Sequence, residues 1–209
     1  GMAERFTDKV VIVTGGSRGI GWAIAEALIR EGACVVIASK DPARGEAAAE
    51  ALRAAGGQAI FIRTDVANQD DAERMVAAVW ERFGRIDVLV NNAGITERAP
   101  FTEEGPDLWD RMYRVNVMGT VFPSQAAVRL MQQQGWGSIV HVASKAGVVG
   151  EPGHAAYSAA KGAVISMTRC MAIELAPDNI RVNVVCPGPV VTDMLNTTVP
   201  AAVQARLAA

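Results

Sequence analysis

Tyr157 and Lys161 stand four positions apart in residues 154–175, a segment whose pattern predicts one long helix. Side chains at this spacing lie on the same face of a helix, so the phenol and the ammonium are neighbours. A tyrosine has an ordinary pKa of about 10, but a cation about 4 Å away can lower this pKa by roughly three units. The pair therefore predicts a tyrosine that exchanges protons near neutral pH.

A glycine-rich segment follows the first predicted strand and reads Thr14-Gly15-Gly16-Ser17-Arg18-Gly19-Ile20-Gly21. It leads into an apolar-periodic helix over residues 22–30, which stops at Gly32. Glycines allow a tight turn that approaches a pyrophosphate closely, and the amides at the helix start face the anion. The order of strand, glycine turn and helix predicts a phosphate site. For this segment alone, a tight turn without a ligand is the alternative.

Short apolar segments rich in β-branched residues alternate with longer helical segments along the chain. The predicted strands cover residues 9–13, 34–38, 59–62, 86–90, 138–142 and 181–185. These strands are almost continuously apolar, as expected where helices cover both faces of a parallel sheet. The pattern predicts an α/β fold with a doubly wound, Rossmann-like parallel sheet in three layers, α/β/α. Nothing interrupts it, so residues 1–209 are expected to form a single domain.

Two of the intervening helices have readable start and stop signals. Asp41, which precedes a proline, predicts a helix start, and Gly56 marks the end of that helix. Asn68, with Asp71 three positions later, opens the next helix, which Gly84 closes. We expect both helices to be crossover connections between parallel strands.

The composition excludes several classes of function. Half of the 209 residues are apolar and the formal net charge is −2, which rules out a disordered or strongly charged tail protein. The basic residues are scattered, so no electrostatic footprint for nucleic acid is present. The longest stretch without a charged side chain has 15 residues, too few to span a membrane. The charged start of the chain and three widely separated cysteines fit a cytoplasmic protein without a bound metal.

The glycines at positions 15, 19 and 21 have the spacing Gly-x-x-x-Gly-x-Gly, and further motifs follow in order at predicted strand ends and helices. These motifs are Asp65-Val66, Asn91-Asn92-Ala93-Gly94, Asn116, Ser144, Tyr157 with Lys161, Pro187-Gly188 and Thr192. The set resembles the short-chain dehydrogenase/reductase family, and in general appearance its 3-oxoacyl-carrier-protein reductase type. The resemblance covers nearly the whole chain and implies an NAD(P)-dependent oxidoreductase.

The resemblance implies four catalytic residues, Asn116, Ser144, Tyr157 and Lys161. Tyr157 would act as acid or base, Ser144 would bind the substrate oxygen, and Asn116, in a locally distorted helix, would hold a water that links Lys161 to solvent. The cofactor would lie at the carboxyl ends of the strands. The residues expected to bind it are Gly15, Ser17, Arg18, Gly19, Ile20, Gly21, Ser39, Lys40, Asp65, Val66, Asn91, Ala93, Gly94, Tyr157, Lys161, Pro187, Gly188 and Thr192.

The end of the second predicted strand distinguishes the two nicotinamide cofactors. A carboxylate there accepts hydrogen bonds from the ribose hydroxyls of NAD(H), whereas basic residues accommodate the 2′-phosphate of NADP(H). The strand ends in Ser39 and Lys40, without a carboxylate, and Arg18 projects from the glycine turn. These residues favour NADP(H). NAD(H) is the alternative, because Asp41 is close in sequence and both cations could be solvated surface charges.

The expected substrate is a small molecule that carries a secondary alcohol or a ketone. A 3-oxoacyl thioester is the alternative, although its acidic carrier protein would need a basic patch, which the neighbouring segments lack. Candidate contacts are Thr96, the segment 146–154 with Val148, Val149, Glu151 and His154, and the tail from Val190 onward with Met194. The other histidine, His141, lies in a predicted buried strand and is expected to be structural.

Members of the family normally continue beyond the position of Ala209 with another helix and a last strand. These elements close the substrate cleft and form part of the interface of a homo-oligomer, which is a dimer or tetramer. Without them, a truncated and non-catalytic dinucleotide-binding module is the alternative from another functional class.

Overall fold

The computed structural model describes residues 4–190, which form six strands and the helices that connect them. The strands are β1 (Val10–Thr14), β2 (Cys34–Ser39), β3 (Gln58–Arg63), β4 (Val88–Asn91), β5 (Gly137–Val142) and β6 (Ile180–Val185). The α-helices of these residues are α1 (Gly19–Arg30), α2 (Pro42–Ala54), α3 (Gln69–Phe83), α4 (Pro106–Tyr113), α5 (Gly119–Gln134) and α6 (Ala155–Leu175). A π-helical turn, η2 (Arg114–Met118), joins α4 to α5.

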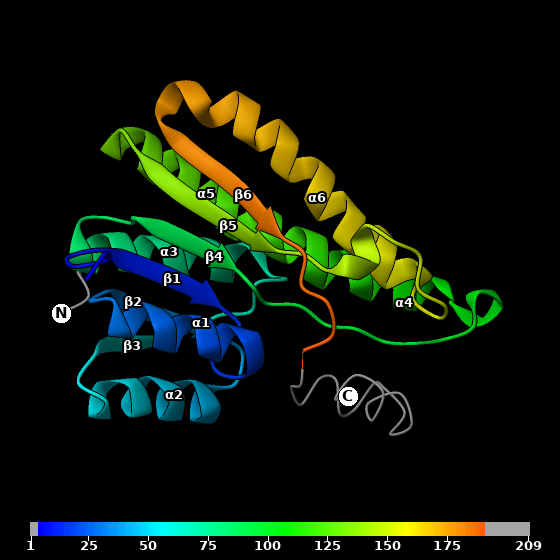
Figure 1. Ribbon diagram of the computed structural model, residues 1–209, viewed down its shortest axis with the longest axis horizontal. Helices are drawn as coiled ribbons and strands as arrows, with labels where there is room; N and C mark the ends of the chain where they lie inside the picture. Colours follow the sequence, from blue (N-terminus) through cyan, green and yellow to red (C-terminus); the bar gives the residue numbers. More distant parts are fainter. Residues whose placement is uncertain (1–3, 191–209) are drawn as a thin grey trace.

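The strands form one parallel sheet in the order β3-β2-β1-β4-β5-β6. The chain winds outward from β1 to β3 and then returns to β4, so the direction of winding reverses between β1 and β4 (Figure 1). In an open α/β sheet, such a reversal leaves a crevice at the carboxyl ends of the two strands. The predicted fold class is therefore confirmed, and the fold indicates where a ligand binds.

Both faces of the sheet are covered by helices, as the central strand β1 shows. Val10 and Ile12 belong to a buried cluster with side chains of α3 and α5. Val11 and Val13 point to the other face and pack with side chains of α1 and α2. Successive strand residues face opposite sides, so a strand between two helical layers must be apolar at every position.

Most predicted boundaries agree with the structure to within one or two residues, and two differences concern the candidate site. Helix α1 begins at Gly19, three positions before the predicted start, because the helix starts inside the glycine turn. Strand β4 begins at Val88, two positions later than predicted, after the fully buried Asp87, whose side chain accepts a hydrogen bond from the Val10 amide. The predicted caps at Asp41 and Asn68 are confirmed, since each side chain accepts a backbone hydrogen bond from the first turn of its helix.

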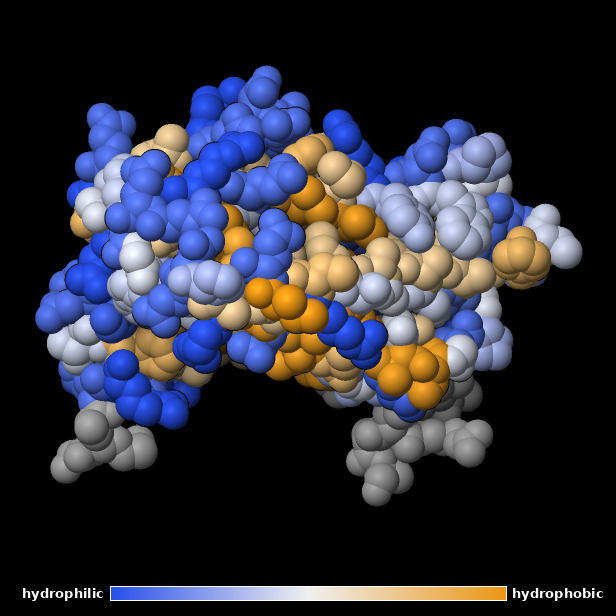
Figure 2. All heavy atoms as spheres, turned by 90° about the horizontal axis from the view of Figure 1, so that it is seen from above, coloured by the Kyte–Doolittle hydropathy of each residue, from blue (hydrophilic) through white to orange (hydrophobic). Residues whose placement is uncertain are grey.

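The surface on the side of α6 carries a band of apolar side chains. Figure 2 views the molecule from this side and shows the band between two more polar ends. The exposed large apolar residues include Ile173 of α6 and Val185 of β6. Among residues 4–190, no helix is long and apolar enough to cross a membrane.

Candidate active site

The glycine turn joins β1 to α1 and leaves the start of the helix open. Gly15 and Gly19 have φ values of 63° and 55°, in the left-handed region that residues with a side chain rarely adopt. At the N-cap position, Arg18 has an extended backbone and its side chain makes no capping hydrogen bond. The first amides of α1 are therefore left without a side-chain partner, which is the arrangement that the predicted phosphate site requires.

Asn92 fixes the glycine turn to the end of β4. Its Nδ2 atom donates to the carbonyl oxygens of Thr14 and Gly15, at 3.0 and 3.2 Å, and its backbone amide donates to Thr14 Oγ1 at 3.0 Å. Gly21 lies beneath this arrangement, where a Cβ would overlap Gly15 O and Asn92 Nδ2. The sequence motif contained Asn92, but we predicted no role for it. The sequence could have indicated this role, because Asn92 comes directly after β4, the strand beside β1 and its glycine turn. An amide side chain at that position can bond to the backbone of the turn.

Asn91 is the last residue of β4, and its side chain points to the face of the sheet that α5 covers, so, contrary to the prediction, it does not line the cleft. Its Nδ2 atom donates to Ser124 Oγ of α5 at 2.9 Å and lies 3.2 Å from His141 Nδ1. The side chains of Asn91 and Asn92 point in opposite directions because consecutive residues of a strand face opposite sides of the sheet. His141 is fully buried, and burial lowers its pKa to about 4, with the charge of Lys161 acting in the same direction. The imidazole is therefore neutral at pH 7.

A cleft of about 320 Å³ follows the carboxyl ends of the strands and brings the glycine turn together with the tyrosine and lysine. Many of the predicted residues line this cleft, among them Gly15, Ser17, Arg18, Gly19, Ile20, Ser39, Lys40, Asp65, Val66, Ala93, Gly94, Asn116, Tyr157 and Lys161. Arg44 and Thr64 also line it and were not predicted. The cleft therefore runs from the end of β2 to helix α6.

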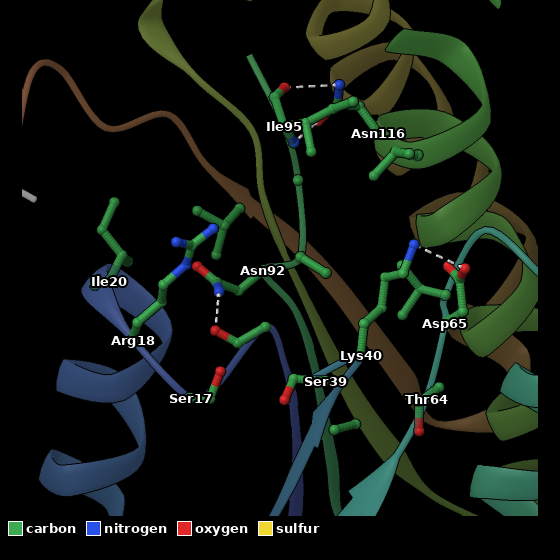
Figure 3. A pocket seen from close by; sticks show the side chains of 18 of the residues that line it. Ser17, Arg18, Ile20, Ser39, Lys40, Thr64, Asp65, Asn92, Ile95 and Asn116 are labelled. Carbon is green, nitrogen blue, oxygen red and sulfur yellow. Dashed lines mark hydrogen bonds and ion pairs between the residues drawn. The ribbon is translucent and has the colours of Figure 1, made fainter. Parts of the chain in front are cut away.

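Several charged side chains line one end of the cleft, and Figure 3 shows Lys40 with Asp65 on one side of Ser39 and Arg18 on the other. Lys40 Nζ lies 3.0 Å from Asp65 Oδ2, an ion pair that the sequence did not predict. Arg44 Nε lies 3.9 Å from Asp41 Oδ2. Ser39 Oγ is buried and has no hydrogen-bond partner among the described residues. A buried hydroxyl without a partner costs free energy, and Ser39 itself is among the residues that line the cleft.

Asn116 lies in the π-helical turn η2, and the predicted local distortion of the helix is confirmed. Its side-chain amide donates to Ile95 O at 3.0 Å and accepts from Ile95 N at 3.1 Å (Figure 3). This pair of hydrogen bonds holds the chain after β4 against η2. A Cβ on Gly94 would lie 2.7 Å from Asn116 Oδ1 and 3.2 Å from Lys161 Nζ. Only a glycine therefore allows these three residues to approach so closely.

Lys161 and Tyr157 are both withdrawn from water. Lys161 is 5% exposed, its Nζ atom donates to Val142 O at 3.1 Å, and burial lowers its pKa to about 8. Burial raises the pKa of Tyr157, and a hydrogen bond with Ser144 opposes this rise. The predicted lowering of the Tyr157 pKa by Lys161 is therefore not found, because burial dominates and the ammonium bonds to a carbonyl. The Tyr157 hydroxyl is protonated at neutral pH.

Ser144 follows β5 and begins a short 3-10 turn, η3 (Lys145–Gly147). Its Oγ atom accepts a hydrogen bond from Ala146 N at 3.1 Å, which fixes the side chain. Ser144 is close enough to Tyr157 to oppose the rise of the tyrosine pKa. Of the four predicted catalytic residues, Asn116, Tyr157 and Lys161 line the cleft where it reaches α6, whereas Ser144 lies beside Tyr157 and is not part of the lining.

The predicted polar substrate contacts lie beside Tyr157. The ring of His154 is 5.3 Å from the ring of Tyr157, and His154 Nε2 lies 3.3 Å from Thr96 Oγ1. Glu151 approaches His154 Nδ1 at 3.5 Å and pairs with Arg98, which was not predicted, at 2.5 Å. Burial, with a contribution from Arg98, lowers the pKa of His154. The neutral imidazole is buried and held between Thr96 and Glu151, and none of these three residues lines the cleft.

The remaining predicted residues lie near the end of the described chain. Pro187 O accepts a hydrogen bond from Lys145 N at 2.9 Å, and neither Pro187 nor Gly188 lines the cleft. Thr192 and Met194 fall outside the described residues. Within residues 4–190, no group of three or more His, Cys, Asp or Glu side chains could hold a metal ion.

The chain belongs to the short chain dehydrogenase family, which it matches over residues 9–202. It is an oxidoreductase of this family, whose members act on alcohols and ketones and bind a nicotinamide dinucleotide. Cyclopentanol dehydrogenase of Comamonas sp. is 40% identical over 202 residues, which are 97% of this chain and 81% of that protein.

Two solved structures show the same fold with different cofactors. A gluconate 5-dehydrogenase from Burkholderia cenocepacia, in complex with NADP and tartrate, has a TM-score of 0.91 and 34% identity over 95% of this chain and 78% of its own. An NAD⁺-bound xylitol dehydrogenase has a TM-score of 0.86 and 38% identity, over 88% of this chain and 71% of its own. The cofactor preference of this chain must therefore be argued from its own residues.

Proposed function

We propose that this chain is an NADP(H)-preferring oxidoreductase that interconverts a secondary alcohol and a ketone of a small molecule. The observation that carries the proposal is that Asn116, Tyr157 and Lys161 line the same cleft as the glycine turn. A nicotinamide cofactor, when bound, supplies the hydride donor or acceptor. The tasks of the protein are then orientation and proton transfer.

We assign the proton transfer to Tyr157 and the binding of the substrate oxygen to Ser144. In reduction, the Tyr157 hydroxyl gives its proton to the ketone oxygen, and in oxidation the tyrosinate, whose own proton has passed to the neutral amine of Lys161, takes the proton of the alcohol. The raised pKa of Tyr157 supports its role as the acid, because the proton is present at neutral pH. A hydrogen bond from Ser144 would hold the reacting carbon in position.

Lys161 restores the proton that Tyr157 gives up. With a pKa of about 8, this ammonium can lose and regain a proton near neutral pH at little cost. Asn116 is proposed to hold a water that links Lys161 to solvent. This role is supported by the π-helical turn, where the regular backbone hydrogen-bond ladder is interrupted.

The cleft fits a dinucleotide, and its charged end favours a 2′-phosphate. The amides of the glycine turn fit the pyrophosphate, and the unpartnered Ser39 Oγ fits a polar group of the adenosine ribose. Arg18, Lys40 and Arg44 supply positive charge around Ser39, where a carboxylate would favour NAD(H). Asp65 and Val66 are proposed to contact the adenine. Ala93 and Gly94, which line the cleft, are proposed to contact the nicotinamide half. The resemblance to the family is the only support for contacts from Pro187, Gly188 and Thr192.

The substrate is proposed to be a small alcohol or ketone with both apolar and hydroxyl groups. The exposed Val148 and Val149 offer apolar surface, and the neutral His154 with Thr96 offers hydrogen bonds. Both halves of the cleft are built on one sheet, which supports a single domain. The apolar band over α6 supports the proposed homo-oligomer.

The test compares Tyr157→Phe with Tyr113→Phe, which alters the other tyrosine of the chain. The substrate panel contains cyclic ketones, sugar-derived ketones and a 3-oxoacyl thioester, each with NADPH and with NADH. We expect Tyr157→Phe to lower turnover by about 10²–10⁴-fold, the usual contribution of a general acid, with NADPH binding retained. Tyr113 is 40% exposed and stacks on Trp109 through a ring that the Phe variant keeps, so its activity should match the wild type.

Three outcomes of this test contradict parts of the proposal. Activity that survives in Tyr157→Phe overturns the assigned mechanism. Cofactor binding without turnover across the whole panel favours a binding module. Turnover of the 3-oxoacyl thioester alone overturns the substrate class.

A further inference from the structure

The cations around Ser39 differ in how they are already paired. Lys40 has Asp65 as its partner at 3.0 Å, and Arg44 has Asp41 at 3.9 Å. Arg18 forms no ion pair within the described residues, although it lines the same cleft. An incoming phosphate would therefore meet the guanidinium of Arg18, unpaired among the described residues, the loosely paired guanidinium of Arg44 and the ammonium of Lys40, which already has a close carboxylate partner.

Asp65 is the fixed member of its ion pair. Its Oδ1 atom accepts a hydrogen bond from Ala67 N at 3.0 Å, and its own amide donates to Asp71 Oδ2 at 3.1 Å. The Asp71 carboxylate is in turn bound by Arg63 and Arg74. The Asp65 side chain is only 25% exposed, whereas that of Lys40 is 69% exposed. The loop after β3 thus holds the carboxylate, and Lys40 reaches across to it.

We propose that Asp65 limits the preference of this protein for a 2′-phosphate by competing for Lys40. This inference rests on the proposed cofactor site. Lys40 has a single point charge, which it must share between the Asp65 carboxylate and a phosphate bound near Ser39. Asp65 also repels the phosphate directly, but this repulsion acts through solvent and is screened by salt.

The consequence is a site that discriminates between the two cofactors only in part. Ser39 carries no charge that would repel a 2′-phosphate, and its hydroxyl can also bond to a ribose hydroxyl. With Lys40 engaged by Asp65, the additional affinity for a 2′-phosphate depends chiefly on Arg18. Removing the Asp65 charge should therefore increase selectivity for the phosphorylated nucleotide, although it removes a residue of the binding cleft.

The test measures binding of two nucleotide probes, adenosine 2′,5′-bisphosphate and adenosine 5′-monophosphate, by calorimetry. The probes differ only in the 2′-phosphate, so the ratio of their dissociation constants cancels changes in the adenine contacts. The proteins are the wild type, Asp65→Asn, Lys40→Gln and the double variant. Asparagine keeps the Oδ1 acceptor for Ala67 N, which preserves the loop.

We expect Asp65→Asn to raise the selectivity ratio about two- to fivefold, the range that an exposed ion pair can supply. In the Lys40→Gln background, the same change should raise the ratio by less than half as much, because the competition no longer exists. Asp70→Asn removes a carboxylate from the first turn of α3 that contacts neither residue, and it should leave the ratio unchanged. Added salt should reduce the effect of Asp65→Asn.

Equal effects of Asp65→Asn with and without Lys40 would overturn the inference and leave the cofactor proposal intact. If neither nucleotide binds the wild type, both the inference and the proposed cofactor site fail. If Asp65→Asn does not fold, Lys40→Gln and Arg18→Gln decide the question. The inference predicts that Lys40→Gln reduces the ratio less than Arg18→Gln, and an equal or larger reduction contradicts it.

Discussion

The two ends of the cleft are built from opposite kinds of side chain. At the Ser39 end, charged groups lie at the surface, and the Lys40 side chain is 69% exposed. At the Tyr157 end, Lys161 is 5% exposed and Asn116 is fully buried. Exposed ion pairs contribute about 1 kcal/mol or less, whereas burial can shift a pKa by several units. In the proposed function, the first end therefore adjusts the affinity for the cofactor in small steps, and the second determines whether a proton can move.

The largest expected effect comes from Lys161→Met, which removes the buried ammonium at the Tyr157 end of the cleft. The variant removes the cation that restores the proton of Tyr157, and turnover should fall by about 10²–10⁴-fold, as for other proton-transfer groups. Steady-state kinetics with NADPH and a ketone substrate measures this loss. Lys145→Met is the control, because this lysine is exposed in the neighbouring turn and makes no ion pair within residues 4–190. Equal losses in both variants would show that the effect is not specific to the buried ammonium.

The next effect concerns the stability of the buried end against acid. The pKa of His141 is about 4 in the folded protein, below the ordinary value of 6.5, so only the unfolded chain binds a proton between these values. The contribution of the neutral imidazole to the free energy of unfolding is fully present above pH 6.5. It decreases by about 3 kcal/mol as the pH falls from 6.5 to about 4.

His141→Gln should remove this part of the pH dependence. Urea unfolding of both proteins at pH 7.5 and pH 4.5 gives the four free energies needed. The free energy of unfolding should fall less between pH 7.5 and pH 4.5 in the variant than in the wild type. A pH-independent difference would mean that the buried imidazole takes up its proton as readily as in water.

A smaller effect is expected from Gly94→Ala, which fills the space that the buried groups share. The new methyl group would lie 2.7 Å from Asn116 Oδ1, so the side chains must shift, at a cost of about 1–3 kcal/mol. Gly150→Ala is the matched control, because a Cβ there meets nothing within 4 Å. Thermal unfolding of both variants measures the difference. If both unfold at the same temperature, the close approach of Gly94, Asn116 and Lys161 is not a constraint.

The smallest effect belongs to the exposed end. Asp41 Oδ1 accepts a hydrogen bond from Arg44 N and caps α2, so Asp41→Ala should lower the free energy of unfolding by about 1 kcal/mol. Asp41→Asn retains the acceptor and should retain most of the stability, which urea unfolding can show. A loss as large in Asn as in Ala would mean that the charge, and not the cap, provides the stability.

The sequence predicted the sheet, the glycine turn and the gathering of Ser144, Tyr157 and Lys161 because each depends on local rules. A parallel sheet requires apolar strands, and strand ends meet at one edge whatever the details of packing. The caps at Asp41 and Asn68 follow from side chains that bond to their own helix. Such features need no knowledge of distant contacts.

The features that were not predicted depend on which distant groups meet. The direction of Asn91 and Asn92 depends on where β4 ends, and the sequence places that end only to within a residue or two. The ion pair of Lys40 with Asp65 joins the ends of two neighbouring strands. The raised pKa of Tyr157 results from burial. The spacing of Tyr157 and Lys161 along the helix gives no information on how deeply the tyrosine is buried. Each of these required the packing of the whole chain.

The π-helical turn η2 also constrains how the chain length can change. A π turn holds one residue more than a regular turn of an α-helix, so the extra residue is absorbed locally and the helix after it keeps its orientation. Phe122, Ala127 and Met131 of α5 therefore still face the interior that they fill. Deleting a single residue from Arg114–Met118 is expected to make the turn regular and displace Asn116 while α5 stays packed, whereas a deletion within α5 would rotate the residues after it by about 100°.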